Sequence, residues 1–248
     1  MVVRNHGPML SQSHKQGNVM AIMSMALYGS RARNDHTSES DTDLFAITSD
    51  ERYQMVFHGT TNIACYPRNL AMSRAEGGDL FFLHIVREAV VMYDPDSSFE
   101  KMQSAFKLRD NYSDDIFKAV ELGIALLFNI ENYKNYFYIN KRLVWCLRTI
   151  LIALSAERGS PVFSAKELAS TFEDKEIELL LSAKKEPGFI PDIYRTFKQK
   201  FALYGGDGHE AIPSDLYDQL KYFSLQGNSM AEKTIFNIIK NMGENDYT

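Results

Sequence analysis

The sequence predicts an α+β protein, in which a small mixed-sheet domain precedes an all-helical domain. Two observations lead to this fold class. Strand-like apolar runs alternate with helical stretches up to residue 98, and beyond it apolar side chains recur at helical spacing. A chain of 248 residues with 45% hydrophobic residues can bury a substantial core. We expect a first domain over residues 16–98, with helices on one side of its sheet, a helical domain over 99–248, and a boundary within 96–112.

The first elements enclose a polar segment. The apolar run 19–28 predicts a helix end that feeds a short strand, and this run stops at Gly29-Ser30. Residues 31–40 are polar and predict a surface loop or a first helical turn. The run 43–47 then predicts a buried strand.

The rest of the first domain continues this alternation. Residues 56–58 and 61–66 predict one or two strands with a turn at Gly59-Thr60, and Pro67 ends the pairing because it has no amide proton. The remaining predicted elements are helices over 68–76 and 80–88, separated by Gly77-Gly78, and a last strand over 90–93.

Helical periodicity organises the second domain. Ser164 and Glu167 have the side chains of a capping box that opens a helix. Apolar residues recur at spacings of three and four at Ile116, Val120, Ile124, Leu127 and Phe128, and again at Leu143, Leu147, Ile150, Leu151 and Leu154. Further helices are predicted over about 174–185, 189–203 and 213–242.

Composition limits the classes of function. The net charge of −5 gives no strong DNA-binding signal. No apolar stretch approaches the roughly 20 residues that a membrane helix needs, and the polar residues 1–15 resemble no signal peptide and are expected to be poorly ordered. Cys65 and Cys146 lie in apolar runs, which predicts two buried thiols and a cytoplasmic protein.

The most informative stretch combines Gly29-Ser30, ten residues, and Asp41-Thr42-Asp43. A Gly-Ser corner after a strand offers backbone amides and a hydroxyl to an anion, and glycine lets a phosphate approach closely. Carboxylates two residues apart at the head of a strand project from one face, where a hard divalent ion such as Mg²⁺ can bind them. The stretch therefore predicts a phosphate cradle beside a metal site.

This arrangement resembles the small bacterial nucleotidyltransferases of the DNA polymerase β superfamily. The resemblance extends to residues 84–94, which look like the late helix and final strand of that family. The size and order of the two domains resemble aminoglycoside nucleotidyltransferases such as the kanamycin and streptomycin enzymes.

The resemblance implies a role for each half of the motif. Gly29 and Ser30 would bind the triphosphate, and Asp41 and Asp43 would be catalytic and hold Mg²⁺. The implied reaction is attack of an acceptor hydroxyl on the α-phosphate with release of pyrophosphate. ATP is the default donor, because nothing in the motif selects a base. Nucleotide-binding candidates also include two arginines, Arg31 and Arg33, although Arg33 could equally pair with Asp35 or Glu39.

The chain departs from the family at one position. The family carries a third carboxylate on a later strand, and Asn62 stands there in this sequence. An amide can ligate a metal through oxygen but cannot act as a base. Three explanations stay open: another acid such as Asp79 or Glu76 completes the site, the acceptor brings its own activation, or the protein is weakly active or a non-catalytic nucleotide binder.

Three functional hypotheses follow from these readings. The first is modification of a small molecule such as an aminoglycoside, which an acidic cleft between the domains would favour. The second is transfer of a nucleotide to a protein or RNA, which a basic face on the helical domain would favour. The third is a non-catalytic nucleotide-binding regulator or antitoxin-like partner protein, motivated by Asn62.

Other polar and aromatic residues are interpreted as structural. His58 and His84 lie in apolar segments and are expected in the core or at its boundary, whereas His36 is expected at the surface. A solvated helix face is expected for Lys184, Lys185, Arg195, Lys198 and Lys200. Packing between the two domains is expected for Tyr133, Tyr136, Phe137 and Tyr138.

Overall fold

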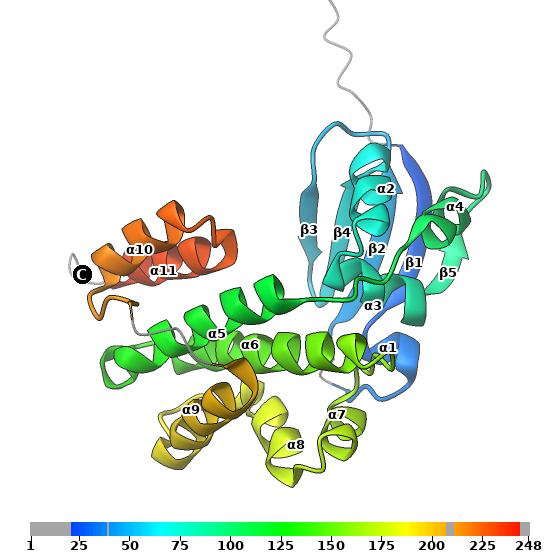
Figure 1. Ribbon diagram of the computed structural model, residues 1–248. Helices are drawn as coiled ribbons and strands as arrows, with labels where there is room; N and C mark the ends of the chain where they lie inside the picture. The colour runs from blue at the N-terminus through cyan, green and yellow to red at the C-terminus, as the bar shows by residue number, and fades with distance from the viewer. Residues whose placement is uncertain (1–20, 39, 207–210, 244–248) are drawn as a thin grey trace, which may run out of the picture.

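The computed structural model describes residues 21–38, 40–206 and 211–243, so the predictions for residues 1–15 lie outside the described part of the chain. Figure 1 shows two parts: a sheet with short helices, and a bundle of longer helices that extends from one end of it. This is the α+β architecture that the sequence predicts.

A five-stranded mixed sheet forms the first part. Its strand order is β3-β4-β2-β1-β5; β2 and β4 are parallel, and the other neighbours are antiparallel. The strands are β1 (Ile22–Tyr28), β2 (Thr42–Thr48), β3 (Gln54–His58), β4 (Thr61–Pro67) and β5 (Val90–Tyr93). Because β3 is an edge strand, His58 is exposed, and the prediction that it lies in the core or at its boundary is wrong.

Four helices accompany the sheet: α1 (Ser30–Arg33), α2 (Arg68–Glu76), α3 (Leu80–Glu88) and α4 (Ser98–Ala105). Helices α2 and α4 pack against each other and against the central strands. Phe45 and Ile47 of β2 are fully covered in this core. Helix α4 adds Phe99 and Met102 to it, and the division of the chain at residues 98 and 99 stays a prediction.

The second part is entirely helical in the residues that the structure describes. It contains α5 (Ser113–Phe128), η1 (Ile130–Asn132), α6 (Tyr136–Glu157), α7 (Ala165–Thr171), α8 (Lys175–Ser182), η2 (Ala183–Lys185), α9 (Pro191–Gly205), α10 (Leu216–Leu225) and α11 (Ser229–Gly243). Helices α5 and α6 run side by side, with α7 to α9 on one flank and α10 and α11 on another. The capping box at Ser164 and Glu167 is confirmed.

Two predictions for this helical part need correction. The helix predicted over 213–242 is two helices, because Gly227 takes φ of 66° between them. The aromatic residues near 133–138 do not pack between the domains. Tyr133, Tyr136 and Tyr138 pack on the core of the helical part, and Phe137 is exposed.

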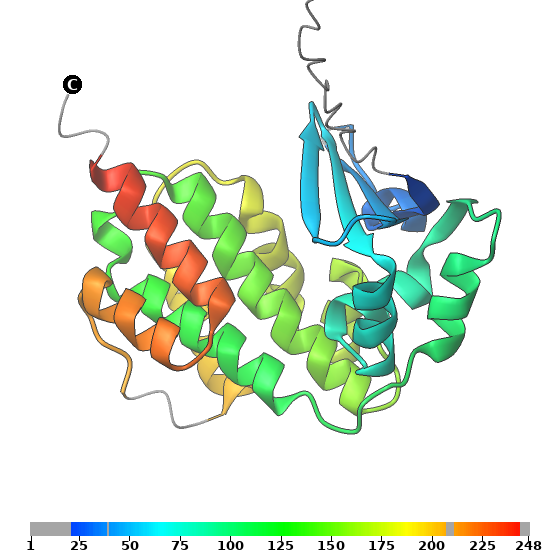
Figure 2. The ribbon, with the colours of Figure 1, turned by 90° about the horizontal axis from the view of Figure 1, so that it is seen from above.

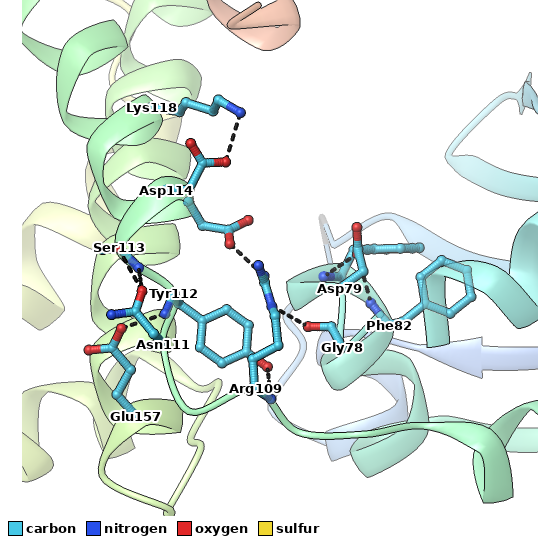
Figure 3. A network of polar contacts seen from close by, with 12 residues as sticks. Gly78, Asp79, Phe82, Arg109, Asn111, Tyr112, Ser113, Asp114, Lys118 and Glu157 are labelled. Atoms are coloured by element: carbon cyan, nitrogen blue, oxygen red, sulfur yellow. Dashed lines mark hydrogen bonds and ion pairs between the residues drawn. The ribbon is translucent and has the colours of Figure 1, made fainter. Parts of the chain in front are cut away.

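A short linker joins the two parts and is fixed at both ends (Figure 3). Arg109 donates from Nε to the Gly78 carbonyl at 3.0 Å and pairs through Nη2 with Asp115 at 2.5 Å. Its guanidinium also lies 4.2 Å from the centre of the Tyr112 ring. Gly78 has φ of 64°, and a Cβ there would collide with the Lys107 carbonyl oxygen. One arginine therefore holds the first domain against the start of α5.

Candidate functional site

Asp43 lies at the centre of the predicted site, on the middle strand of the sheet. It pairs in register with Tyr28 on β1 and with Asn62 on β4, so the three side chains share one face of the sheet at the same end of their strands. Burial, with Asp43 as the next cause, raises the pKa of the Tyr28 phenol well above its ordinary value. Tyr28 therefore stays neutral beside the carboxylate.

Gly29 packs closely against this carboxylate. It has φ of 76°, in the region that favours glycine, and a Cβ there would lie 3.1 Å from Asp43 Oδ2. Ser30 follows as the first residue of α1, whose first amide groups have no partner within the helix. The two halves of the sequence motif thus meet in space, with the Gly-Ser corner next to Asp43.

Asn62 interacts with the same carboxylate from the other side. Its Nδ2 donates to Asp43 Oδ1 at 3.0 Å. The amide therefore stabilises a negative charge on Asp43, where a third carboxylate would repel it. Asn62 therefore lies next to Asp43, and its place as the third position of a metal site stays a prediction.

Asp41 is exposed, and Arg31 holds the backbone around it. The Arg31 guanidinium donates to the carbonyls of Ser40 at 2.7 Å and Asp41 at 3.2 Å. The Thr42 amide donates to the Thr60 carbonyl at 2.8 Å, which fixes the start of β2. These contacts give Arg31 a role in shaping the loop; its binding to nucleotide stays a prediction.

Arg33 joins a polar network instead of standing free. It contacts Asp35 at 3.0 Å, Glu88 at 2.7 Å and His84 Nε2 at 3.3 Å. Burial lowers the pKa of Arg33, but the hydrogen bonds to Asp35 and Glu88 raise it more, so the net shift is upward. The predicted pairing with Asp35 is confirmed, and nucleotide binding by Arg33 stays a prediction.

His84 connects this network to the helical part. It lies 2.6 Å from Glu88 and stacks on Phe163 at a centroid distance of 4.8 Å. Burial lowers its pKa more than the hydrogen bond that it donates to Glu88 raises it, so the net shift is downward. Its expected place at the boundary of the core is confirmed by its partial burial, and His36 is exposed as expected.

Cations of the helical part face the motif, which the sequence analysis missed. Lys185 Nζ lies 3.4 Å from Thr37 Oγ1, in the segment of residues 31–40 that we call the motif loop. Element η2 therefore packs against that loop. Burial is the largest cause that lowers the pKa of Lys184, followed by Arg148 and Lys185, while Asp41 and Asp43 raise it. Both lysines are exposed, as expected for a solvated face, although η2 lies against residues 31–40 of the motif.

Arg148 of α6 is half-buried next to Phe163. Its Nη2 donates to the Phe163 carbonyl at 2.6 Å. Burial and Arg33 lower its pKa, while Glu88, Asp35 and Asp43 oppose that shift. Its sequence signal is weak, because α6 also contains Lys141, Arg142 and Glu157 and only the fold brings this helix towards the first domain. The other cations behave differently: Arg195 and Lys198 are exposed as expected, but Lys200 is buried between Asp174 and Glu176.

A cavity of about 600 Å³ lies between the two parts of the molecule, and we call it the interdomain cavity. Aromatic side chains of both parts line it, among them Phe81 and Trp145. Its charged lining consists of Arg74, Asp79, Asp115, Lys118 and Arg148. Asp79 pairs with Arg74 and Asp115 pairs with Arg109, so neither carboxylate is uncompensated.

The donor set around Asp43 suits a hard divalent cation. Asp41 and Asp43 supply carboxylate oxygens, and Asn62 can add an amide oxygen if its side chain turns. No group of three acidic, histidine or cysteine side chains able to hold a metal occurs among the described residues. Asp79 caps α3 by accepting from the amides of Phe81 and Phe82, at the end of that helix opposite Glu88. It therefore does not replace the missing carboxylate.

A mixed-sheet domain with a Gly-Ser corner beside a carboxylate pair is the arrangement on which we based the prediction of a nucleotidyltransferase. Residues 13–119 match the model of the nucleotidyltransferase domain family, and this part of the chain is a nucleotidyltransferase domain. The match includes the whole sheet and the linker to α5.

Whole chains were also compared with curated proteins and with solved structures. Comparison with curated proteins gives no significant match. Among solved structures, a nucleotidyltransferase-like protein from Exiguobacterium sibiricum shares 13% identity, over 83% of this chain and 86% of that chain, with a TM-score of 0.28. Within the residues that the structure describes, every helix is too short or too polar to cross a membrane.

Proposed function

We propose that the protein transfers a nucleoside monophosphate from a nucleoside triphosphate, with ATP as the default donor, to a hydroxyl group of an acceptor. The observation that supports this best is the way in which Gly29 and Asn62 hold the Asp43 carboxylate in place. Gly29 lies under its Oδ2, where a Cβ would come within 3.1 Å, and Asn62 holds its Oδ1 at 3.0 Å. The Asp43 carboxylate is thereby oriented next to the Gly-Ser corner.

Each group has a role in the proposed reaction. The corner at Gly29 leaves room for phosphate oxygens, and the Ser30 hydroxyl and backbone amides can donate to them. The carboxylates of Asp41 and Asp43 would hold Mg²⁺, which offsets charge on the phosphoryl group when it is bound. The network of Arg33, Glu88 and His84 fixes α1 against α3 and keeps the corner in place.

The interdomain cavity is proposed as the place of the acceptor. Its lining contains three cations and two carboxylates, and both carboxylates are paired with arginine. A polycationic aminoglycoside would meet no free negative charge there. The lining therefore favours a neutral or anionic acceptor and weakens the first of our three hypotheses.

The experiment incubates the full chain with α-labelled ATP, Mg²⁺ and candidate acceptors. It measures transfer of the label to the acceptor and release of pyrophosphate. We expect substitution of both carboxylates, Asp41→Ala with Asp43→Ala, to lower activity by at least about a hundredfold, as expected for loss of a metal site. Glu51→Ala is the matched control, since it removes an exposed carboxylate of the same domain outside the pair. Activity that survives in the double variant would refute the proposal.

A second candidate function is nucleotide binding without turnover. The hydrogen bond from Asn62 to Asp43 favours it, because an amide in this position cannot deprotonate an acceptor. Binding and turnover separate the two candidates. A wild-type chain that binds ATP with Mg²⁺ but releases no pyrophosphate with any acceptor would support the binder.

A further inference from the structure

Strand β5 forms one edge of the sheet, and within the described part of the chain it pairs only with β1. All four of its residues are apolar, and each is between 45% and 62% exposed: Val90, Val91, Met92 and Tyr93. Helix α4, which follows β5 in the chain, packs against α2 and β1 (Figure 1). An exposed apolar edge strand offers unpaired backbone groups to another strand, so β5 is a candidate interaction surface.

The opposite edge strand, β3, is less apolar. It begins with Gln54 and ends with His58, and its exposed large apolar side chains are Met55 and Phe57. Strand β5 has no polar side chain at all. Pairing at β5 would therefore remove more contiguous apolar surface from water than pairing at β3.

A second copy of the chain fits this edge by symmetry. Two β5 strands can pair antiparallel about a two-fold axis. Paired side chains then share a face of the sheet only if the axis passes through one residue, which is Val91 or Met92 near the middle of the strand. An axis at Val91 sets Val90 opposite Met92 of the other copy, and an axis at Met92 sets Val91 opposite Tyr93. Both registers pair apolar side chains across the strands.

The charges beside β5 are also complementary in such a pair. Arg87, in the last turn of α3, is exposed and forms no ion pair within the described residues. Asp94 and Asp96 follow the strand; Asp94 accepts from two amides of α4, whereas the Asp96 carboxylate accepts from the Ser98 hydroxyl at 3.3 Å. In an antiparallel pair the beginning of each strand lies beside the end of the other. Each Arg87 would thus approach the acidic end of the second copy.

We propose that β5 pairs with the β5 strand of a second copy of this chain, so that the two five-stranded sheets become one continuous sheet across a two-fold axis. Pro95 has no amide proton and limits the length of this ladder. The interface is therefore smaller than the standard area of about 1,600 Å², and we expect a dissociation constant of roughly 10–100 µM. Pairing does not depend on transfer activity, so its failure would leave the proposed function untouched.

Sedimentation velocity of the full chain between about 5 µM and about 500 µM measures this association. Val91→Lys sets like charges near the axis and should raise the dissociation constant at least about tenfold, with Met92→Lys as the second variant if Val91→Lys fails to fold. Phe57→Lys, on the exposed edge of β3, is the matched control and should leave the constant unchanged. Arg87→Glu should weaken pairing by about 3- to 10-fold, and adding Asp96→Arg should restore it, because the two charges are then exchanged.

Cysteine cross-linking locates the axis. Under mild oxidation either Val91→Cys or Met92→Cys should form a disulfide between copies, because opposite residues on the axis have Cα atoms about 4.5–5.5 Å apart. The native thiols of Cys65 and Cys146 are buried, and Phe57→Cys is the control that should not cross-link. A chain that stays monomeric at about 500 µM, or a dimer that tolerates Val91→Lys, overturns the inference and leaves the edge to a strand of a different protein.

Discussion

At the scale of single residues, the amide of Asn62 sets the electrostatics around Asp43. As a donor at 3.0 Å it stabilises the charge of that carboxylate without any cation. A carboxylate in its place would add a like charge and make the fold of the site depend on metal. Asn62 thus stabilises the Asp43 carboxylate by hydrogen bonding.

Substitution of Asn62 by aspartate tests this reasoning. Without metal, Asn62→Asp should lower the free energy of unfolding by roughly 1–3 kcal/mol, because it removes a hydrogen bond to a charged group and adds repulsion. Added Mg²⁺ should restore the loss by binding the folded state. Urea unfolding with and without Mg²⁺ measures both effects. Asn132→Asp, at an exposed position, should show neither; equal behaviour of the two variants would contradict the role given to Asn62.

Gly29 gives a second residue-scale prediction. Gly29→Ala should reduce transfer activity or nucleotide binding by at least about tenfold, because the new Cβ would press on Asp43 Oδ2 from 3.1 Å. Gly59→Ala is the control, since Gly59 also has positive φ, 58°, but nothing lies within 4 Å of its Cβ. Both variants should lose about 1–2 kcal/mol of stability through backbone strain. If Gly59→Ala lowered activity as much, strain alone would explain the loss.

At the scale of elements, local signals were predictable and long-range ones were not. The strand at 43–47, the helices over 68–76 and 80–88 and the capping box at Ser164 follow from neighbouring residues, and all are confirmed. The break at Gly227 was missed because the apolar period continues through it. The contact of Lys185 with Thr37 was missed because it depends on the packing of η2 against the first domain.

The junction of α8 and α9 gives a prediction about pH. Asp174 accepts from Lys200 at 2.7 Å and from Tyr204 at 2.9 Å. Burial raises the pKa of Asp174, but these hydrogen bonds lower it more, so the folded value lies below the ordinary one. The contribution of this carboxylate to stability is then present above about pH 4 and is lost as the pH falls through the folded pKa.

Asp174→Asn should therefore lower the free energy of unfolding by roughly 1–3 kcal/mol at neutral pH, because it leaves the buried Lys200 with only Glu176. The difference from wild type should shrink below about pH 4, where the wild-type carboxylate also becomes neutral. Urea unfolding at a series of pH values measures it. Asp192→Asn, which breaks an exposed pair with Arg195, is the control. A difference for Asp174→Asn that stays constant down to low pH would contradict the assignment.

At the scale of the whole molecule, function depends on how the two parts are held together. The interdomain cavity is lined by residues of both parts. The linker between them is short and carries Arg109, which bonds to Gly78 on one side and Asp115 on the other, as Figure 3 shows. Glu157 at the end of α6 accepts from the Tyr112 amide at 2.5 Å and adds a second tie.

Arg109→Gln should loosen this junction without disturbing either core. We expect a loss of roughly 1–3 kcal/mol in the free energy of unfolding, faster proteolysis within residues 106–112, and weaker binding of ATP, because the helical part would no longer be held firmly against the first domain. Arg195→Gln removes an arginine from an exposed ion pair, which contributes about 0–1 kcal/mol, and should leave all three measurements unchanged. Weaker ATP binding without faster proteolysis would instead indicate that Arg109 acts on the nucleotide by its charge, and the mechanical role given to it here would be wrong.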